Sequence, residues 1–181
     1  MRFIGRRMRF VSVGADIFLP YLKECRSERT YAAVVQCDVR FLPFRSNSFD
    51  VVLCMEVLEH LERDGGERLL NEMERVARLQ IILTTPLGSY EQHEYDGNSY
   101  QKHRHIWSPA TLKRLGYRVV GHGVRGMGSW AGIQSPLPPI LRPIAHLVWV
   151  MAGPVVRYLP VLAGNMVAIK RLYGSAGNGT G

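Results

Sequence analysis

The chain has 181 residues, of which 46% are apolar and 21% charged, and it carries a formal net charge of +8 at pH 7. This length and composition predict a globular chain of about one domain and exclude disordered and collagen-like chains. No apolar run reaches the roughly 20 residues of a membrane-spanning helix, and the basic opening segment lacks the apolar stretch of a signal peptide. Three cysteines without paired spacing exclude a disulfide scaffold or a zinc clamp and favour a cytoplasmic protein.

The charge is distributed unevenly along the chain. Residues 1–96 hold 13 Lys and Arg against 15 Asp and Glu, whereas residues 97–181 hold 10 Lys and Arg and no carboxylate. This asymmetry suggests an anionic partner, such as a nucleic acid, a phosphorylated substrate or an acidic membrane surface. The alternative is that these basic side chains only keep the C-terminal part hydrated.

The chain begins by alternating apolar runs with helical patterns. Residues 10–17 predict a buried strand that delivers Asp16 to its end, and residues 18–28 predict a short helix. A second strand is predicted over 32–37 and is followed at once by Asp38.

The pattern then repeats. Residues 49–55 (FDVVLCM) predict a third buried strand, and a helix begins at 56–61, which the pair Gly65-Gly66 interrupts. A second, amphipathic helix ends near Arg78, and residues 80–85 predict a fourth strand. The apolar side chains at helical spacing in that second helix are Leu69, Leu70, Met73 and Val76.

Residues 87–108 are polar, aromatic and long for a loop, which predicts a lid or a binding loop. Ser108 followed by Pro109 is typical of a helix start and predicts a short helix over 109–115. Further strands are predicted to begin at 117–121 and to occupy 165–171.

The predicted organisation is a core over 1–133 that contains the loop, followed by an apolar, Pro-punctuated insertion over 134–163. A last strand within 164–173 and a flexible tail over 174–181 complete it. The insertion's uncharged run, 143–156, is too short to span a bilayer. It is expected to form a buried helix, to lie in a membrane interface, or to line a pocket for a greasy substrate.

Strands alternating with helices predict an α/β fold with a Rossmann-like, doubly wound and mostly parallel sheet. Ligands of such sheets bind beyond the carboxyl ends of the strands. Three acidic strand ends, Asp16, Asp38 and Glu56, are therefore expected to line one crevice. The alternative is turn chemistry, because Asp after a strand commonly starts a turn.

Five segments together resemble the class I S-adenosylmethionine-dependent methyltransferases of type 11, and the likeness covers roughly residues 10–125. The segments are VGADIF (13–18), CDVRFLPF (37–44), NSFDVVLCMEVLEHL (47–61), NEMERVAR (71–78) and IILTTP (81–86). The resemblance implies S-adenosylmethionine as the cofactor and a small, lipid-like or anionic methyl acceptor. Nucleic acid is disfavoured, because Cys54–Glu56 replaces the turn that amino-group methyltransferases of nucleic acids carry.

The resemblance also implies roles for single residues. Asp16 matches the carboxylate that accepts hydrogen bonds from the cofactor's two ribose hydroxyls, and Asp38 with Val39 matches the adenine contact. Met55 and Glu56 match positions beside the methionine part of the cofactor. The implied cofactor-binding set is Asp16, Ile17, Asp38, Val39, Met55 and Glu56.

A hydroxyl acceptor would need a base, and His60, His103 and His105 are the candidates, because histidine titrates near neutral pH. The loop 90–109 also resembles the substrate-facing loop of the family, and its implied acceptor-recognition residues are Tyr95, Asn98, Tyr100, Arg104 and Trp107. A metal site formed by His93, Glu94, His103 and His105 is disfavoured, because no cysteine joins them and alternating histidines in a loop are common without metal. We therefore expect no metal.

The chain departs from the family at its start. Only 15 residues precede Asp16, too few for the strand, glycine-rich turn and helix that hold the cofactor in the family. We expect a domain truncated at its N-terminus, lacking a central strand, with two exposed strand edges and a tendency to form homo-oligomers.

Two functions are carried forward. The first is methyl transfer by the complete form of the domain. The second is a non-catalytic, methyltransferase-like module that docks on a membrane surface or a partner protein through residues 134–163. A dinucleotide oxidoreductase is a weaker third reading, because no glycine fingerprint is present.

Overall fold

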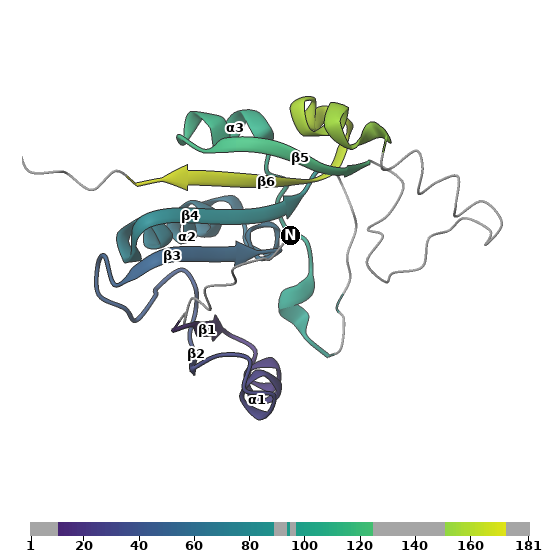
Figure 1. Cartoon of the computed structure of the whole chain (residues 1–181). Coiled ribbons are helices and arrows are strands. Elements are labelled where there is room, and N and C mark those ends of the chain that lie inside the picture. The colour runs from purple at the N-terminus through teal and green to yellow at the C-terminus, as the bar shows by residue number, and fades with distance from the viewer. Residues whose placement is uncertain (1–10, 89–93, 95–96, 125–150, 173–181) are drawn as a thin grey trace, which may run out of the picture. The chain divides into compact units, whose positions relative to one another are not determined.

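The computed structural model describes residues 11–88, 94, 97–124 and 151–172, and the chain divides into two compact units, 1–43 and 44–181 (Figure 1). Each unit is considered by itself. Among the described residues, no helix combines the length and apolar character needed to cross a bilayer.

The first unit contains strand β1 (Val13–Asp16), helix α1 (Leu19–Ser27) and strand β2 (Ala33–Gln36). The two strands are parallel and pair from Val13 with Ala33 to Asp16 with Gln36. All three predicted elements are therefore confirmed, each shorter than expected. The strands are only half-buried or exposed, rather than buried, because each has a single strand neighbour within this two-stranded sheet.

The second unit is built on a four-stranded sheet in the order β3-β4-β6-β5 (Figure 1). Its strands are β3 (Phe49–Met55), β4 (Ala77–Pro86), β5 (Arg118–Val124) and β6 (Ala163–Arg171). β3 and β4 are parallel, and β6 runs antiparallel to both β4 and β5, between which it lies. The expected α/β class is confirmed, with an antiparallel return of the last strand.

Helix α2 (Arg63–Val76) corrects one expectation, because Gly65 and Gly66 lie inside it and do not interrupt it. Packing explains the glycine at 66. A Cβ there would overlap Cζ2 of Trp107 and lie 3.2 Å from Cε2 of the same ring. Gly66 therefore allows the helix to approach the indole closely, and the helical spacing of the apolar residues continues through it.

The core lies between α2 and the sheet. Leu69, Leu70 and Met73 of the helix are buried, as are Ile81 and Leu83 of β4. Helix α3 (Pro109–Arg114) covers part of the same unit, and it begins as predicted, with Ser108 Oγ accepting a hydrogen bond from the Thr111 amide at 3.0 Å. The described residues also include the short 3₁₀ turns η1 (Leu58–His60), η2 (Ser99–Gln101) and η4 (Pro160–Leu162).

Strand β3 forms an edge of its sheet and is not buried as predicted. Its side chains Val51, Leu53 and Met55 are 46%, 63% and 55% exposed. Such an apolar run is typical of a parallel strand covered on both faces, whereas β3 pairs only with β4 among the described residues. This is one of the two edges at which the sequence predicts an absent strand.

Most of the predicted insertion, 134–150, lies outside the described residues, as do the tail from residue 174 onward and the first ten residues. Residues 151–158 form a helix, and η4 follows it before β6 begins. Val156 of that helix is buried, whereas Met151, Val155 and Tyr158 are 70%, 51% and 76% exposed.

Candidate functional site

The strongest cluster of polar side chains lies where the chain leaves β3. Glu56 turns the chain with a left-handed φ of 51°, and η1 follows with Glu59 and His60. The Glu56 amide donates to the carbonyl oxygen and to Oγ1 of Thr84 in β4, each at 3.2 Å. These bonds hold a backbone conformation that costs a non-glycine residue energy, and so they fix the start of the turn.

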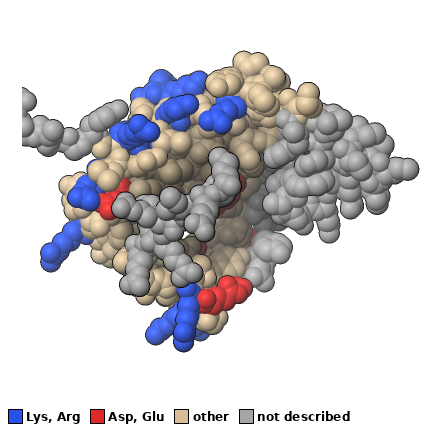
Figure 2. Space-filling model, viewed as in Figure 1, with Lys and Arg blue, Asp and Glu red and all other residues tan. Residues whose placement is uncertain are grey.

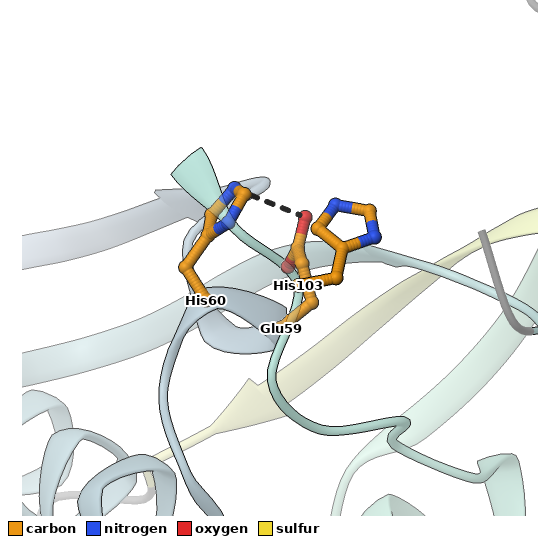
Figure 3. Close-up of side chains that lie close together, drawn as sticks. All are labelled: Glu59, His60 and His103. Carbon is orange, nitrogen blue, oxygen red and sulfur yellow. Dashed lines mark ion pairs between the residues drawn. The ribbon is translucent and has the colours of Figure 1, made fainter. Parts of the chain in front are cut away.

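Residues 102–105 lie against this turn. The amides of Arg104 and His105 both donate to the carbonyl oxygen of Glu59, at 2.8 and 3.2 Å. Trp107 Nε1 donates to the Leu58 carbonyl oxygen at 3.2 Å. These bonds bring His103 beside His60, with 5.0 Å between the ring centroids, and Figure 3 shows the Glu59 carboxylate between the two rings.

Glu59 is buried, with only 3% of its surface exposed, and neither carboxylate oxygen has a partner in hydrogen-bond geometry among the described residues. The buried hydroxyl of Thr85 nonetheless interacts with this carboxylate and lowers its pKa, an effect smaller than that of burial. Its Oε1 lies 4.0 Å from Nε2 of His60, beyond hydrogen-bond distance (Figure 3). Burial raises the pKa of Glu59 to about 7, and the nearby negative charge of Glu56 adds to the shift.

His60 is held in one tautomer. Its Nδ1 lies 3.2 Å from the Lys102 carbonyl oxygen, which can only accept, so Nδ1 carries the proton. Burial, opposed by this bond, lowers the pKa of His60, and the electrostatic interaction with His103 lowers it further. The imidazole is therefore neutral near pH 7, and its Nε2 lone pair faces the Glu59 carboxylate.

Glu59 was not among the residues that the sequence singled out. Glu59, His60 and His103 each offer one ligand atom, and these atoms lie within 4.8 Å of one another. The metal set considered from the sequence is not the one brought together: His93 lies outside the described residues, Glu94 is exposed, and His105 packs edge-on to Trp107 at 5.1 Å. The sequence shows that Glu59 and His60 are adjacent, but it does not show that His103 folds back beside them.

The predicted acceptor-recognition residues occupy different environments. Asn98 is 2% exposed, and its side-chain oxygen accepts a hydrogen bond from the Tyr100 amide at 3.0 Å, which caps η2. Arg104 pairs with Glu62 at 3.4 Å, and Tyr100 is 50% exposed. Trp107 is 1% exposed and belongs to the core, and Tyr95 lies outside the described residues.

Asp16 and Asp38 of the first unit both show turn chemistry. Asp16 Oδ1 accepts a hydrogen bond from the Phe18 amide at 2.7 Å, and Asp38 Oδ1 accepts one from the Arg40 amide at 2.9 Å. The Arg40 guanidinium also binds both Asp38 oxygens and lowers the pKa of that carboxyl group. Asp16 Oδ2, in contrast, has no hydrogen-bond partner among the described residues.

The remaining residues of the predicted cofactor set lie at strand ends. Ile17 and Val39 are half-buried in the first unit, and the Ile17 carbonyl oxygen accepts a hydrogen bond from Gln36 Nε2 at 3.1 Å. Met55 and Glu56 are exposed at the end of β3 in the second unit.

Comparison with known proteins gives one family match. Residues 4–80 match the family model described as "Methyltransferase domain". The search of curated protein sequences finds no match.

Solved structures share the fold. A SAM dependent methyltransferase from Archaeoglobus fulgidus is 21% identical, with 89% of this chain and 76% of that chain covered and a TM-score of 0.52. The chain solved in complex with the Haloferax volcanii Trm112 methyltransferase activator is 16% identical, with 87% and 69% covered and a TM-score of 0.52. The cyclase SpnF is 15% identical, with 88% and 65% covered and a TM-score of 0.51. These likenesses establish a Rossmann-like α/β fold.

Proposed function

Because residues 4–80 belong to the class I S-adenosylmethionine-dependent methyltransferases of type 11, we propose that this chain serves methyl transfer to a small, lipid-like or anionic acceptor, in the complete form of its domain. The observation that carries the proposal is the extent of the family match. It begins before β1 and ends within β4, so it includes both Asp16 and the turn with Glu59 and His60.

The implied cofactor is S-adenosylmethionine, which supplies an electrophilic methyl group on a sulfonium sulfur. Of the two aspartates that the resemblance assigns to the cofactor, Asp16 fits this role and Asp38 does not. Asp16 keeps one carboxylate oxygen available at the end of β1, which suits a ribose hydroxyl. Asp38 is engaged by Arg40 through both oxygens, so an adenine contact there would fall to Val39 and its backbone.

On the acceptor side, proximity and alignment supply most of the acceleration of methyl transfer. The turn after β3 offers an acceptor the neutral imidazole of His60, the ring of His103 and the carboxylate of Glu59 (Figure 3). An anionic acceptor is favoured by the basic surface of the second unit. Figure 2 shows Lys and Arg side chains gathered where Figure 1 places α3, which carries Lys113 and Arg114.

Calorimetric titration of the full chain with S-adenosylhomocysteine tests the cofactor half of the proposal. We expect micromolar binding, and we expect Asp16→Ala to weaken it about tenfold or more, because a ribose hydroxyl would lose its charged acceptor. Asp50→Ala is the matched control. Asp50 is an exposed aspartate near the start of β3, and it pairs with Arg78. Equal affinities of Asp16→Ala and the native chain would remove Asp16 from the site.

Cofactor binding alone does not establish methyl transfer, because this fold also carries other chemistry, as in the cyclase SpnF. The acceptor half therefore needs a labelled-methyl assay against panels of small anionic and lipid-like hydroxyl compounds. A folded chain that binds neither S-adenosylhomocysteine nor S-adenosylmethionine would contradict the proposal as a whole.

A second candidate, docking on an anionic membrane surface, is favoured by the helix over 151–158. Met151, Val155 and Tyr158 recur at i, i+4 and i+7, so they form one exposed apolar stripe. The helix also carries the exposed Arg157, and residues 97–181 contain basic residues but no carboxylate side chain. An apolar stripe with basic neighbours is the pattern by which peripheral helices bind acidic bilayers.

Sedimentation with vesicles of phosphatidylcholine and phosphatidylserine tests this candidate. We expect binding that weakens as salt rises, and Val155→Asp should weaken it several-fold, because a charge would enter the stripe. Val11→Asp is the control, since Val11 is also an exposed valine but lies in the first unit. If the vesicle affinity is the same with and without phosphatidylserine, and the same for Val155→Asp as for the native chain, docking on an acidic bilayer is contradicted.

A further inference from the structure

We propose that Glu59, His60 and His103 form a binding site for one divalent transition-metal ion. The ligands would be one carboxylate oxygen and two imidazole nitrogens, contributed by η1 and by the segment after η2. The proposal concerns metal binding itself and does not depend on methyl transfer.

The first argument is the unpaired carboxylate. A buried carboxylate is costly unless it is paired, and within the part of the chain that the structure describes, no donor is in hydrogen-bond geometry with either buried oxygen of Glu59. Nε2 of His60 lies 4.0 Å from Oε1 of Glu59, too far to donate a hydrogen bond, and the proton of that ring is on Nδ1. A cation between the three side chains would satisfy both the charge and the oxygens.

The second argument is the orientation of His60. A histidine that ligates a metal almost always donates its other ring N–H to a carbonyl or carboxylate, which fixes the tautomer and leaves a lone pair for the metal. The Nδ1 bond to the Lys102 carbonyl is such a contact, and Nε2 is the atom that faces Glu59 (Figure 3). The imidazole is thus already set in the form that a metal requires.

The third argument is how firmly the three ligands are held. Glu59 and His60 are adjacent in a turn, and the Glu59 carbonyl oxygen accepts from the two amides that immediately follow His103. The ligand atoms lie within 4.8 Å of one another, and they would have to close further on an ion that is bound at about 2.0–2.2 Å.

The donor set selects the metal class. Two imidazoles with one carboxylate suit Zn²⁺, Fe²⁺, Co²⁺ or Mn²⁺, whereas Mg²⁺ prefers oxygen ligands and keeps its water. Three protein ligands would leave coordination positions open, to which an oxygen of a small molecule could bind.

The test uses the full chain, stripped with a chelator and titrated with Co²⁺, whose visible absorption reports ligand geometry. We expect one ion per chain, and we expect Glu59→Gln and His103→Ala each to weaken binding about 100-fold, since each removes a ligand. Glu59→Gln keeps the side-chain shape, and circular dichroism of each variant confirms that it is folded. His122→Ala is the matched control, an exposed histidine of β5 that should leave the affinity unchanged.

Three outcomes would overturn the proposal. The first is a folded chain that binds no Co²⁺. The second is binding whose affinity is unchanged in Glu59→Gln and His103→Ala. The third is Mg²⁺ binding as tight as that of Co²⁺, which would indicate an all-oxygen site elsewhere. None of these results bears on S-adenosylhomocysteine binding, so the two proposals can fail separately.

Discussion

Replacing Trp107 with alanine is expected to lower the free energy of unfolding by about 3–5 kcal/mol, the range for truncation of a large buried aromatic side chain. The indole is 1% exposed, and it packs so closely on α2 that Gly66 has no room for a Cβ. Truncation would also remove the shorter of two hydrogen bonds to the Leu58 carbonyl oxygen, which would keep only the Leu61 amide at 3.4 Å. The loss of this bond at a fully buried residue adds to the cost of the cavity.

The effect should extend to the site, because the Trp107 bond joins residue 107 to the turn that carries Glu59 and His60. Urea unfolding followed by circular dichroism measures the stability, and Co²⁺ titration measures the site. Ile106→Ala is the control: Ile106 is the neighbouring residue and 55% exposed, so its loss should change stability by no more than about 0.5 kcal/mol. A loss below about 1 kcal/mol for Trp107→Ala would contradict the assignment of this ring to the core.

Local signals predicted the elements well. β3 occupies the predicted residues 49–55, since the apolar run after Asp50 is short and begins with the β-branched Val51 and Val52, features that favour a strand. The start of α3 followed from Ser108 and Pro109, whose capping chemistry needs only the residues beside them. For β3 and for the start of α3, the residues that determine the element lie within it or directly beside it.

Contacts between distant residues could not be predicted in this way. Gly66 was interpreted as a helix breaker, because its partner, the ring of Trp107, lies far along the chain. The His60 ring likewise finds the Lys102 carbonyl 42 residues away, which is what brings His103 into the cluster. Asp16 and Asp38 were correctly placed at strand ends, and both also use an oxygen for the local turn, the alternative that the sequence left open.

Replacing Gly121 with valine is expected to destabilise the second unit by about 3 kcal/mol, because the site has no room for any side chain. A Cβ at Gly121 would overlap the backbone oxygen of Val156 and lie 2.9 Å from Cβ of Ala163. It would also lie 3.1 Å from Cα of Pro160, so two of the three nearest atoms belong to the backbone. Backbone atoms cannot rotate away as a flexible side chain would, so β5 and the helix over 151–158 would have to separate.

Arg118→Val is the matched control, since it places the same β-branched residue in the same strand at an exposed position, where the expected change is within about 0.5 kcal/mol. Urea unfolding of both variants gives the comparison. Because the close approach at Gly121 seats the helix that carries Met151, Val155 and Tyr158, Gly121→Val should also alter vesicle binding, whereas Arg118→Val removes one basic charge and should change only its salt dependence. Equal stabilities of Gly121→Val and Arg118→Val would show that the helix does not pack on β5 as described.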